Sequence, residues 1–385
     1  MEGPEMVSRL SGHPALSPNA HLAAKRAALV AISLTTVLIW GEVLCRIFYR
    51  PPSFHPTPSF FNRLKGERPR WHQEGLFKLG TPLHPRYMRV VTNAYGFRGD
   101  EFAIPKPPNG KRILCLGDSV TFGWGVNNED TYPALLQKML RDSGVKGVEV
   151  LNAGIGDIGT QEELDELPGF LKELQIDHVI VGWYLNDSRP PQGFNDEFMY
   201  EGKLNHFFRT SRLVRHSYFL RMLYELVLQI QVRHAVENNA GLSQRFAWAG
   251  PYNSRNWERD AKEAHRLIDL ARYDWGAAWV PDTWVAIDRQ FSRLQTFAAR
   301  YGFSTTVLAL PVTVQAYGKA DDYPQRQLEM LARKYGWGFA DPLPNMKTSD
   351  PRTLFYDQCH LTPQGNALVA RTLFEQIRPL LGGTR

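Results

Sequence analysis

A serine, a histidine and an aspartate occur in this sequence in settings that could make a hydroxyl nucleophilic. Ser119 follows an apolar run in "RILCLGDSVTFG", residues 112–123. Asp357 precedes His360 by three residues in "YDQCHLTPQGNA". A turn at that spacing can hold a carboxylate against an imidazole, and a hydroxyl nucleophile needs such an oriented base. Two interpretations of Ser119 therefore stand: a nucleophile presented above a sheet, or an ordinary tight turn that contains a hydroxyl.

Acyl transfer through a serine also needs hydrogen-bond donors for the oxyanion that forms. Gly154, in "NAGIGD", follows a second apolar run, where a backbone N–H can be exposed with no side chain in the way. Asn186, in "GWYLND", follows a third run, where its side-chain amide could complete an oxyanion hole. Each feature alone is common in turns. Together they carry weight, because Ser119, Gly154 and Asn186 each follow a predicted strand, while Asp357 and His360 precede the last predicted helix.

The elements that must position these residues alternate between strands and helices after residue 111. Continuous apolar runs predict strands buried on both faces; they are "RILCL", "VEVLNA", "HVIVGWYL", "TTVLAL" and "WGFADP". Helices are predicted from Thr160 with Glu163 in a capping box, from Thr362 with Pro363 at the first helical position, and over 131–143, 284–300 and 324–335. This alternation predicts a parallel sheet with helices on both faces and ligands at the carboxyl ends of the strands.

Four sequence blocks occur in the order found in SGNH hydrolases of the GDSL esterase/lipase superfamily: "LGDSVTFG", "NAGIGD", "GWYLND" and "DQCH". The chain resembles that family over residues 112–187 and 283–382. The resemblance implies a three-layer α/β/α fold and acyl hydrolysis or transfer through an acyl-serine, with no cofactor and no metal. The implied roles are Ser119 as nucleophile, His360 as general base and acid, Asp357 as the residue that orients His360, and the Ser119 and Gly154 N–H groups with the Asn186 amide as the oxyanion hole.

Other assignments of the same residues fit less well. The α/β-hydrolase fold expects G-x-S-x-G, and Thr121 stands where the second glycine belongs. Cys359 adjoins His360, and its place between the two triad residues favours packing over nucleophilic chemistry. The other ten histidines receive no catalytic role, and the three cysteines are too widely spaced for a disulfide framework or a zinc site.

An apolar segment near the N-terminus predicts a membrane anchor. Residues 27–49, "AALVAISLTTVLIWGEVLCRIFY", are long enough to span a bilayer, and Glu42 and Arg46 lie four apart, so they could pair or lie near the headgroups. A buried soluble helix and a cleaved signal peptide are the alternatives. An uncleaved anchor is favoured because no small-x-small cleavage site follows.

The chain accordingly divides into an N-terminal tail (1–26), the transmembrane anchor (27–49), a juxtamembrane lead-in (50–106) and the SGNH hydrolase domain (107–385). The stretch "TNAYGFRGDEF" resembles the lead-in of bacterial family members with an N-terminal anchor and an extracytoplasmic catalytic domain. A periplasmic location is therefore expected, although lysines and arginines on both sides of the anchor leave its orientation open. Scattered charges disfavour nucleic acid as a partner, and nothing in the sequence identifies a protein partner.

Residues 189–282 interrupt the alternation and predict a helical insertion. It contains a basic amphipathic pattern, "SRLVRHSYFLRMLYELVLQIQVRHAV", and, with Trp284 just past its end, five of the ten tryptophans. The tryptophans could stack on sugars and the helix could lie on anionic lipid. Burial of both as a cap over the sheet is favoured, because the helix has more apolar residues than a surface face requires.

The sequence as a whole predicts a membrane-anchored serine esterase that acts on an acyl ester, such as an acetyl or short acyl group on an envelope glycan or lipid. An O-acyltransferase of envelope polysaccharide would use the same triad. A glycan- or lipid-binding module without turnover is a third hypothesis, and the intact catalytic blocks argue against it.

Overall fold

The computed structural model describes residues 18–49, 73–81, 84–156, 158–188, 211–238 and 240–381. By its internal contacts the chain divides into two compact units. Unit 1 comprises Met1–Pro51 and Gly202–Gln229, and unit 2 comprises Pro52–Glu201 and Ile230–Arg385. This division cuts across the predicted insertion, whose residues 189–210 lie outside the described part of the chain, as do residues 1–17 of the tail and 50–72 of the lead-in.

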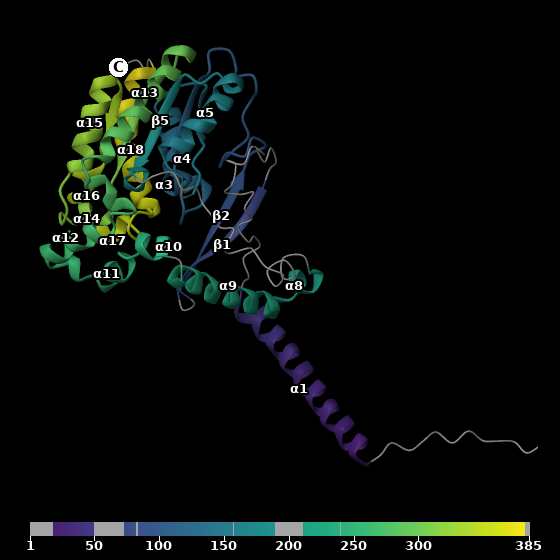
Figure 1. Cartoon of the computed structure of the whole chain (residues 1–385). Helices are drawn as coiled ribbons and strands as arrows, with labels where there is room; N and C mark the ends of the chain where they lie inside the picture. Colours follow the sequence, from purple (N-terminus) through teal and green to yellow (C-terminus); the bar gives the residue numbers. More distant parts are fainter. Residues whose placement is uncertain are drawn as a thin grey trace, which may run out of the picture. The chain divides into compact units, whose positions relative to one another are not determined.

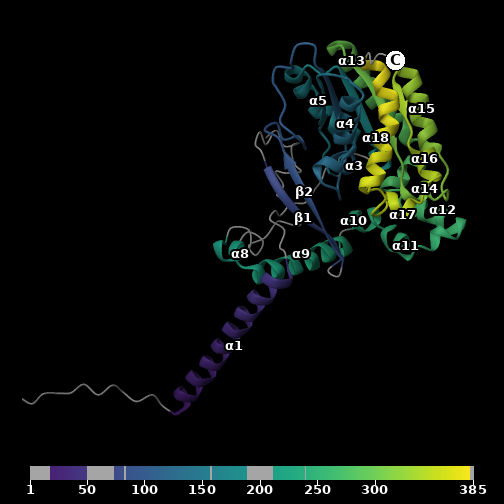
Figure 2. The ribbon, with the colours of Figure 1, turned by 180° about the vertical axis from the view of Figure 1, so that it is seen from behind.

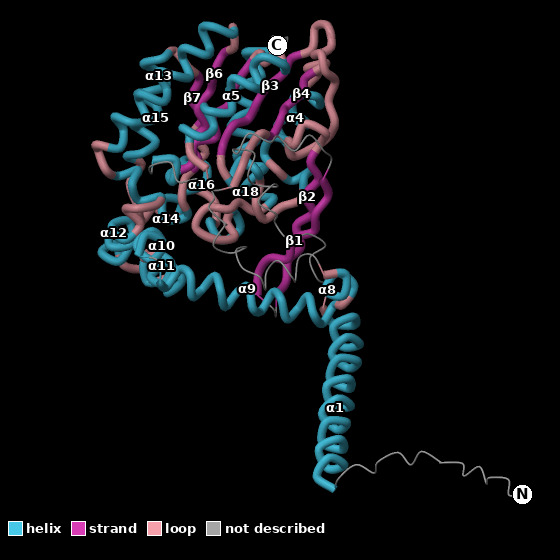
Figure 3. The backbone as a smooth tube through the Cα atoms, turned by 45° about the vertical axis from the view of Figure 1, so that its right-hand side comes forward, coloured by secondary structure: helices cyan, strands magenta, loops and turns pink. Residues whose placement is uncertain are grey.

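Five parallel strands form the central sheet of unit 2, in the spatial order β4-β3-β5-β6-β7. They are β3 (Lys111–Gly117), β4 (Val148–Asn152), β5 (His178–Tyr184), β6 (Ser304–Leu310) and β7 (Gly338–Ala340). In Figure 3 the labelled strands β7, β6, β3 and β4 appear in this order from left to right. All five coincide with the apolar runs, and β3 to β6 are almost wholly buried, as strands covered on both faces must be.

Helices cover both faces of the sheet and complete three layers (Figure 1 and Figure 2). α4 (Tyr132–Asp142) packs against α18 (Pro363–Ile377), whereas α13 (Thr283–Tyr301) packs against α5 (Thr160–Leu174) and α15 (Tyr323–Tyr335). The bounds of α4, α13 and α15 differ from the predicted ranges by one residue at most. The predicted α/β/α fold with a parallel sheet is confirmed.

Shorter elements connect these layers. They are α3 (Ser119–Phe122), η2 (Asn128–Asp130), η3 (Leu185–Ser188), α10 (Ala240–Arg245), α11 (Ala249–Ser254), η4 (Asn256–Glu258), α12 (Ala261–Leu270), η5 (Trp275–Trp279), α14 (Thr313–Ala316), α16 (Leu343–Lys347), α17 (Pro351–Leu354) and η6 (Arg378–Leu381). Before the sheet, β1 (Gln73–Thr81) and β2 (His84–Thr92) pair as an antiparallel hairpin within the predicted lead-in.

The predicted helix caps have different outcomes. Thr362 is the N-cap of α18, as predicted: its hydroxyl accepts from the Gly365 N–H at 3.1 Å. The predicted capping box of α5 is wrong by one residue, because Thr160 is already helical and Gly159 is the N-cap. The Glu162 carboxylate accepts from the Gly159 N–H at 2.9 Å, and Glu163 is therefore left to face the core.

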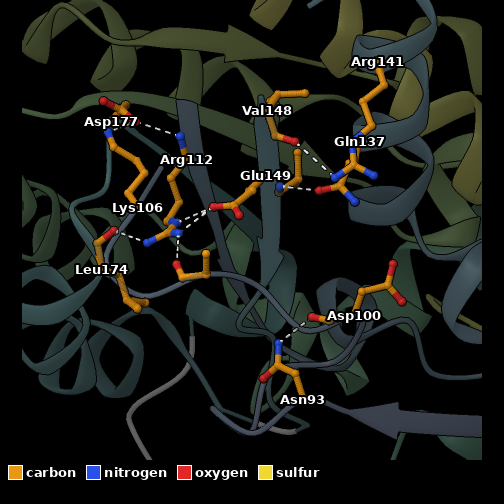
Figure 4. Close-up of polar contacts among 12 residues, drawn as sticks. Asn93, Asp100, Lys106, Arg112, Gln137, Arg141, Val148, Glu149, Leu174 and Asp177 are labelled. Atoms are coloured by element: carbon orange, nitrogen blue, oxygen red, sulfur yellow. Dashed lines mark hydrogen bonds and ion pairs between the residues drawn. The ribbon is translucent and has the colours of Figure 1, made fainter. Parts of the chain in front are cut away.

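A buried ion-pair network closes the amino end of the sheet (Figure 4). Arg112, at the start of β3, is fully buried, and its guanidinium donates to Glu149 Oε2 at 2.6 and 2.8 Å and to the Leu174 carbonyl at 2.6 Å. Asp177 accepts from the Arg112 N–H at 2.7 Å and from Lys106 Nζ at 2.6 Å. The buried guanidinium is thus paired with a half-buried carboxylate, as a buried charge requires.

The second half of the predicted insertion belongs to the core of unit 2. Trp248, Trp257, Trp275 and Trp284 are buried, and Trp279 packs against them. Trp284 lies 5.3 Å from Trp183 of β5 between ring centroids, and Trp248 donates to Asp274 at 3.1 Å. Burial of the tryptophans, the favoured alternative, is confirmed.

Unit 1 holds the predicted anchor. α1 (Pro18–Phe48) contains a candidate membrane span, Leu22–Phe48, with a mean hydropathy of 2.0 and almost no buried residues. The basic amphipathic pattern forms two helices instead of one, α8 (Arg212–His216) and α9 (Tyr218–Asn238), separated at Ser217. α8 and the first half of α9 group with α1 in this unit.

Candidate active site

Ser119 opens the short helix α3 directly after β3. The Asp118 carboxylate caps this helix by accepting from the Val120 N–H at 2.8 Å. Gly117 has a φ of +151°, and a Cβ there would lie 2.0 Å from Thr121 Oγ1, so only glycine permits this turn. The strand therefore ends in a tight turn that leaves Ser119 half-buried at the carboxyl edge of the sheet.

Asp357 and His360 form the compact turn that their spacing predicts. Asp357 Oδ1 accepts from the backbone N–H groups of Cys359 (3.0 Å) and His360 (2.8 Å), which leaves Oδ2 for the imidazole. Thr313, after β6, donates its hydroxyl to the Asp357 carbonyl at 2.6 Å and its N–H to the Gln358 carbonyl at 2.8 Å. The turn is thus fixed to the same edge of the sheet as Ser119.

A continuous chain of hydrogen bonds joins the three side chains. His360 Nδ1 lies 2.7 Å from Asp357 Oδ2, and His360 Nε2 lies 2.9 Å from Ser119 Oγ. An ionised carboxylate only accepts, so Nδ1 carries the proton and Nε2 accepts from the Ser119 hydroxyl. This is the geometry in which an imidazole can remove a proton from a serine.

The electrostatics favour a charged imidazole. Burial by itself would lower the pKa of His360, but the charge and hydrogen bond of Asp357 outweigh it and raise that pKa above its ordinary value, against a smaller opposing effect of Arg86. Burial would raise the pKa of Asp357, yet the charge and hydrogen bonds of His360 hold it below the ordinary value. Asp357 therefore stays ionised and stabilises the imidazolium that proton transfer would create.

The two predicted oxyanion donors lie at the ends of the strands beside β3. Gly154 follows β4, and a Cβ on it would lie 2.2 Å from the Phe122 nitrogen, so its backbone packs directly on α3. Its N–H donates to Asn152 Oδ1 at 3.1 Å, and an oxyanion would have to share or replace that bond. Asn186 follows β5 in η3, is buried, and its Oδ1 has no hydrogen-bond partner in the described part of the chain.

Arg98 supports the nucleophile turn, a role that was not predicted from the sequence. Its guanidinium donates to three carbonyls after Ser119: those of Phe122 (2.9 Å), Gly123 (2.7 Å) and Val126 (2.5 Å). Burial lowers the pKa of Arg98 to about 9, so the group stays charged at neutral pH. The available signal was the arginine in "GFRGD", a string that resembles an ordinary turn.

Three further side chains lie beside the triad. The Trp124 ring is 6.5 Å from the His360 ring between centroids. Tyr356, whose N–H donates to the His360 carbonyl at 2.8 Å, packs close to Gly125 on the loop after α3. The Arg86 guanidinium from β2 stacks 3.4 Å above the Tyr356 ring. The hairpin and the nucleophile loop together therefore form the surroundings of Ser119.

Asp357, Cys359 and His360 also offer ligand atoms within 4.8 Å of one another. The fit to a metal is poor, because Asp357 Oδ2 and His360 Nδ1 already bond each other. Burial, followed by the charges of Asp357 and Asp118, raises the pKa of the Cys359 thiol well above its ordinary value and disfavours the thiolate that binds metals. The arrangement suits proton transfer better than metal binding.

No protein-family model and no curated protein matches the chain. Among solved structures it is similar to TesA, with 14% identity and a TM-score of 0.39 over 70% of this chain and 99% of that one. It is also similar to the acetyl xylan esterase AlAXEase (14%, 0.36, 69% and 98%) and to a catalytic mutant of Axe2, an acetylxylan esterase from Geobacillus stearothermophilus (13%, 0.37, 71% and 96%). At these sequence identities and TM-scores the similarity is limited to the general path of the backbone. The chemistry of this molecule therefore depends on its own side chains.

Proposed function

We propose that this chain is a serine ester hydrolase of the SGNH type, with Ser119 as nucleophile, His360 as general base and acid, and Asp357 as the residue that orients His360. The observation that supports it is the hydrogen-bonded chain from Asp357 Oδ2 through the imidazole to Ser119 Oγ. The setting supports it too, since Ser119 follows a central strand of a parallel sheet, at the edge where ligands bind in such folds.

The geometry supports a two-stage reaction. Nε2 of His360 takes the Ser119 proton while Oγ attacks the ester carbonyl, and the imidazolium, stabilised by Asp357, then protonates the leaving alcohol. The developing oxyanion is held by the Ser119 and Gly154 N–H groups and the Asn186 amide. Water, deprotonated by the same imidazole, attacks the acyl-serine and releases the acid.

The anchor forms part of the proposal. α1 carries the only candidate span among the described residues, and we infer that it is retained in the mature chain, with unit 2 on the periplasmic side. Mass spectrometry of the protein isolated from membranes tests retention, since cleavage of a signal sequence would remove α1. Protease protection in spheroplasts tests the side on which unit 2 lies.

The chemistry is tested with p-nitrophenyl acetate, butyrate and octanoate, comparing the full chain in detergent with its Ser119→Ala variant. We expect turnover that disappears in the variant and a phosphonate ester that labels Ser119 alone. Equal turnover in both proteins would contradict the assignment.

The same assay separates hydrolysis from transfer. If an acetylated polysaccharide fragment accumulates faster than free acid in the presence of an acceptor glycan, the protein is an O-acyltransferase with the same triad. Ligand binding that survives Ser119→Ala, without cleavage of any ester, would favour a binding module.

A further inference from the structure

Arg86 is a cation beside the proposed nucleophile that no carboxylate neutralises in the described part of the chain. Its Nη1 is buried and has no hydrogen-bond partner among the described residues. Its guanidinium stacks at 3.4 Å on Tyr356, whose ring lies against the loop that follows Ser119. Arg86 is also near enough for its charge to oppose protonation of His360. A buried N–H without an acceptor is costly, and a ligand oxygen at this place would remove that cost.

Two buried arginines of unit 2 differ from the half-buried Arg86 in this respect. Arg112 is paired with Glu149, and Arg98 donates to carbonyls and to Asn128 Oδ1. Within the described ranges Arg86 is paired with an aromatic face, which holds the guanidinium plane in position and satisfies none of its N–H groups. A planar, fixed guanidinium is suited to carboxylate and phosphate oxygens.

We propose that Arg86 forms a subsite for an acidic group, a carboxylate or a phosphate, that the ester substrate carries close to its scissile bond. This inference rests on the proposed function and specifies its substrate class. Tyr356 positions the guanidinium, and Trp124, on the same loop as Gly125, provides an apolar surface near His360 for the uncharged part of the substrate.

Matched substrate pairs test the subsite in the full chain. One pair is p-nitrophenyl butyrate and mono-p-nitrophenyl succinate, and the other is monoacetin and acetylated glycerol 3-phosphate. For Arg86→Gln we expect KM to rise about tenfold to a hundredfold on the acidic member of a pair, with the neutral member unchanged. The pair that responds distinguishes carboxylate from phosphate. Arg89→Gln, an exposed arginine of the same strand, is the control and should change neither.

Equal effects of Arg86→Gln on acidic and neutral esters would overturn the subsite. If the wild-type chain cleaves no ester, the proposed function fails, and the subsite is then judged by calorimetry with monomethyl succinate and glycerol 3-phosphate. Binding that Arg86→Gln abolishes supports it, and binding that is absent or independent of Arg86 overturns it.

A different set of contacts carries a second inference, within unit 1. Glu42, near the end of α1, accepts from Ser217 Oγ (2.7 Å) and from the N–H groups of Tyr218 (3.2 Å) and Phe219 (3.1 Å), so it caps the first turn of α9. It also pairs with Arg46 at 2.7 Å, as the spacing allows.

Three more contacts fix α1 to α8 and α9. Arg46 donates to the His216 carbonyl at 3.1 Å, and Cys45 Sγ lies 3.6 Å from Met222 Sδ. A Cβ on Gly41 would lie 2.8 Å from the Phe219 ring, so the glycine permits close packing. Glu42 and Arg46, the polar residues within the apolar sequence of α1, therefore connect this helix to a segment some 170 residues later in the chain.

The apolar surface of α1 continues onto these helices. An open groove of about 740 Å³ is lined by Leu38, Ile39 and Val43 of α1 and by Leu213 and Leu220. Leu213 and Leu226 are exposed, as are the apolar side chains of α1. We infer that α8 and the first half of α9 contact the bilayer together with the end of α1, and that a lipid acyl chain occupies the groove. This inference rests on the proposed anchor and not on the proposed chemistry.

Two measurements on the full chain in vesicles test it. Met222→Cys should form a disulfide with Cys45 under mild oxidation, and not when Cys45→Ser is added. A fluorophore on Leu213→Cys or Leu226→Cys should be quenched by nitroxide-labelled lipid, whereas one on Met330→Cys, an exposed site of unit 2, should not. Absence of the disulfide, or labels at 213 and 226 that are quenched no more than the one at 330, would overturn the inference. Activity that depends on Ser119 is a separate readout.

Discussion

The two ends of the central sheet place the same residue types in opposite environments. At the amino end, His178 of β5 is buried between the hydroxyls of Ser304 (2.7 Å) and Thr306 (3.0 Å), and burial lowers its pKa to about 4. At the carboxyl end, His360 is paired with a carboxylate, which raises its pKa. Burial alone therefore does not make a histidine reactive; the partner on the other ring nitrogen decides which charge state the fold favours.

Two arginines of unit 2, Arg112 and Arg98, also differ in the part of the structure that they stabilise. Arg112, at the amino end, has Glu149 as its partner, and the network it belongs to joins β3 to its neighbours. Arg98 donates to the carbonyls of the nucleophile loop. The first arrangement stabilises the sheet, and the second holds the loop on which the proposed reaction depends.

The largest expected effect separates the two histidines. His360→Gln should lower kcat by about 10⁴-fold or more, because His360 Nε2, at 2.9 Å, is the base hydrogen-bonded closely to Ser119 Oγ, whereas the ionised Asp118 carboxylate at 3.4 Å is a much weaker base. His178→Gln should leave kcat within about twofold, since its ring nitrogens bond the hydroxyls of Ser304 and Thr306 in β6. Ester hydrolysis by folded protein, verified by circular dichroism, measures both. Comparable losses in the two variants would remove the distinction between the ends of the sheet.

The Asn186 amide should have the next largest effect. Asn186→Ala should raise the barrier by about 3 kcal/mol, a loss in kcat of roughly a hundredfold or more with a small change in KM, because the amide acts on the oxyanion. Steady-state kinetics measures it. A loss in kcat of less than tenfold would mean that this residue is not an oxyanion donor.

Substitution of the two buried arginines should have different effects. Arg112→Met should destabilise the fold by roughly 3–5 kcal/mol because it leaves the Glu149 carboxylate without its guanidinium partner, while kcat of the folded fraction stays unchanged. Arg98→Met should also destabilise, but should in addition lower kcat about tenfold by releasing the carbonyls that follow Ser119. Urea unfolding and kinetics at low temperature separate the two effects, and an unchanged kcat in Arg98→Met would reduce that residue to a structural role.

The two histidines should also respond to pH in different ways. kcat/KM requires neutral His360, so it should rise with pH through a midpoint above the ordinary value of about 6.5, and Asp357→Asn should lower that midpoint.

His178 should affect the pH dependence of stability instead. Its folded pKa, about 4, is below its unfolded value, so stability is lost as pH falls from about 6.5 to about 4, by about 1.4 kcal/mol per pH unit.

His178→Gln is the control for both pH dependences, that of stability and that of kcat/KM. It should flatten the loss of stability on the acid side and leave the midpoint of kcat/KM in place. A shift of that midpoint in His178→Gln would show that the two histidines are coupled.

The strands, the principal helices and the positions of Ser119, Asp357 and His360 at the ends of elements could be predicted from the sequence. These features are local: continuous apolar runs, the cap at Thr362 and the three-residue turn before His360 each depend on neighbours in the chain. Even the local error at Thr160 was small, because Glu162 and Glu163 offer the same carboxylate one residue apart, and only packing decides which one enters the core.

The tertiary structure alone decided what depends on contacts between distant residues. His360 Nε2 lies 2.9 Å from Ser119 Oγ although the two residues are 241 positions apart in the chain, and no pattern along the chain encodes that distance. The role of Arg98, the stacking of Arg86 on Tyr356 and the joint between Glu42 and α9 arise in the same way. In each case a polar group leaves water only where a partner from elsewhere in the chain, or a ligand, can satisfy it, and the identity of that partner is set by the fold.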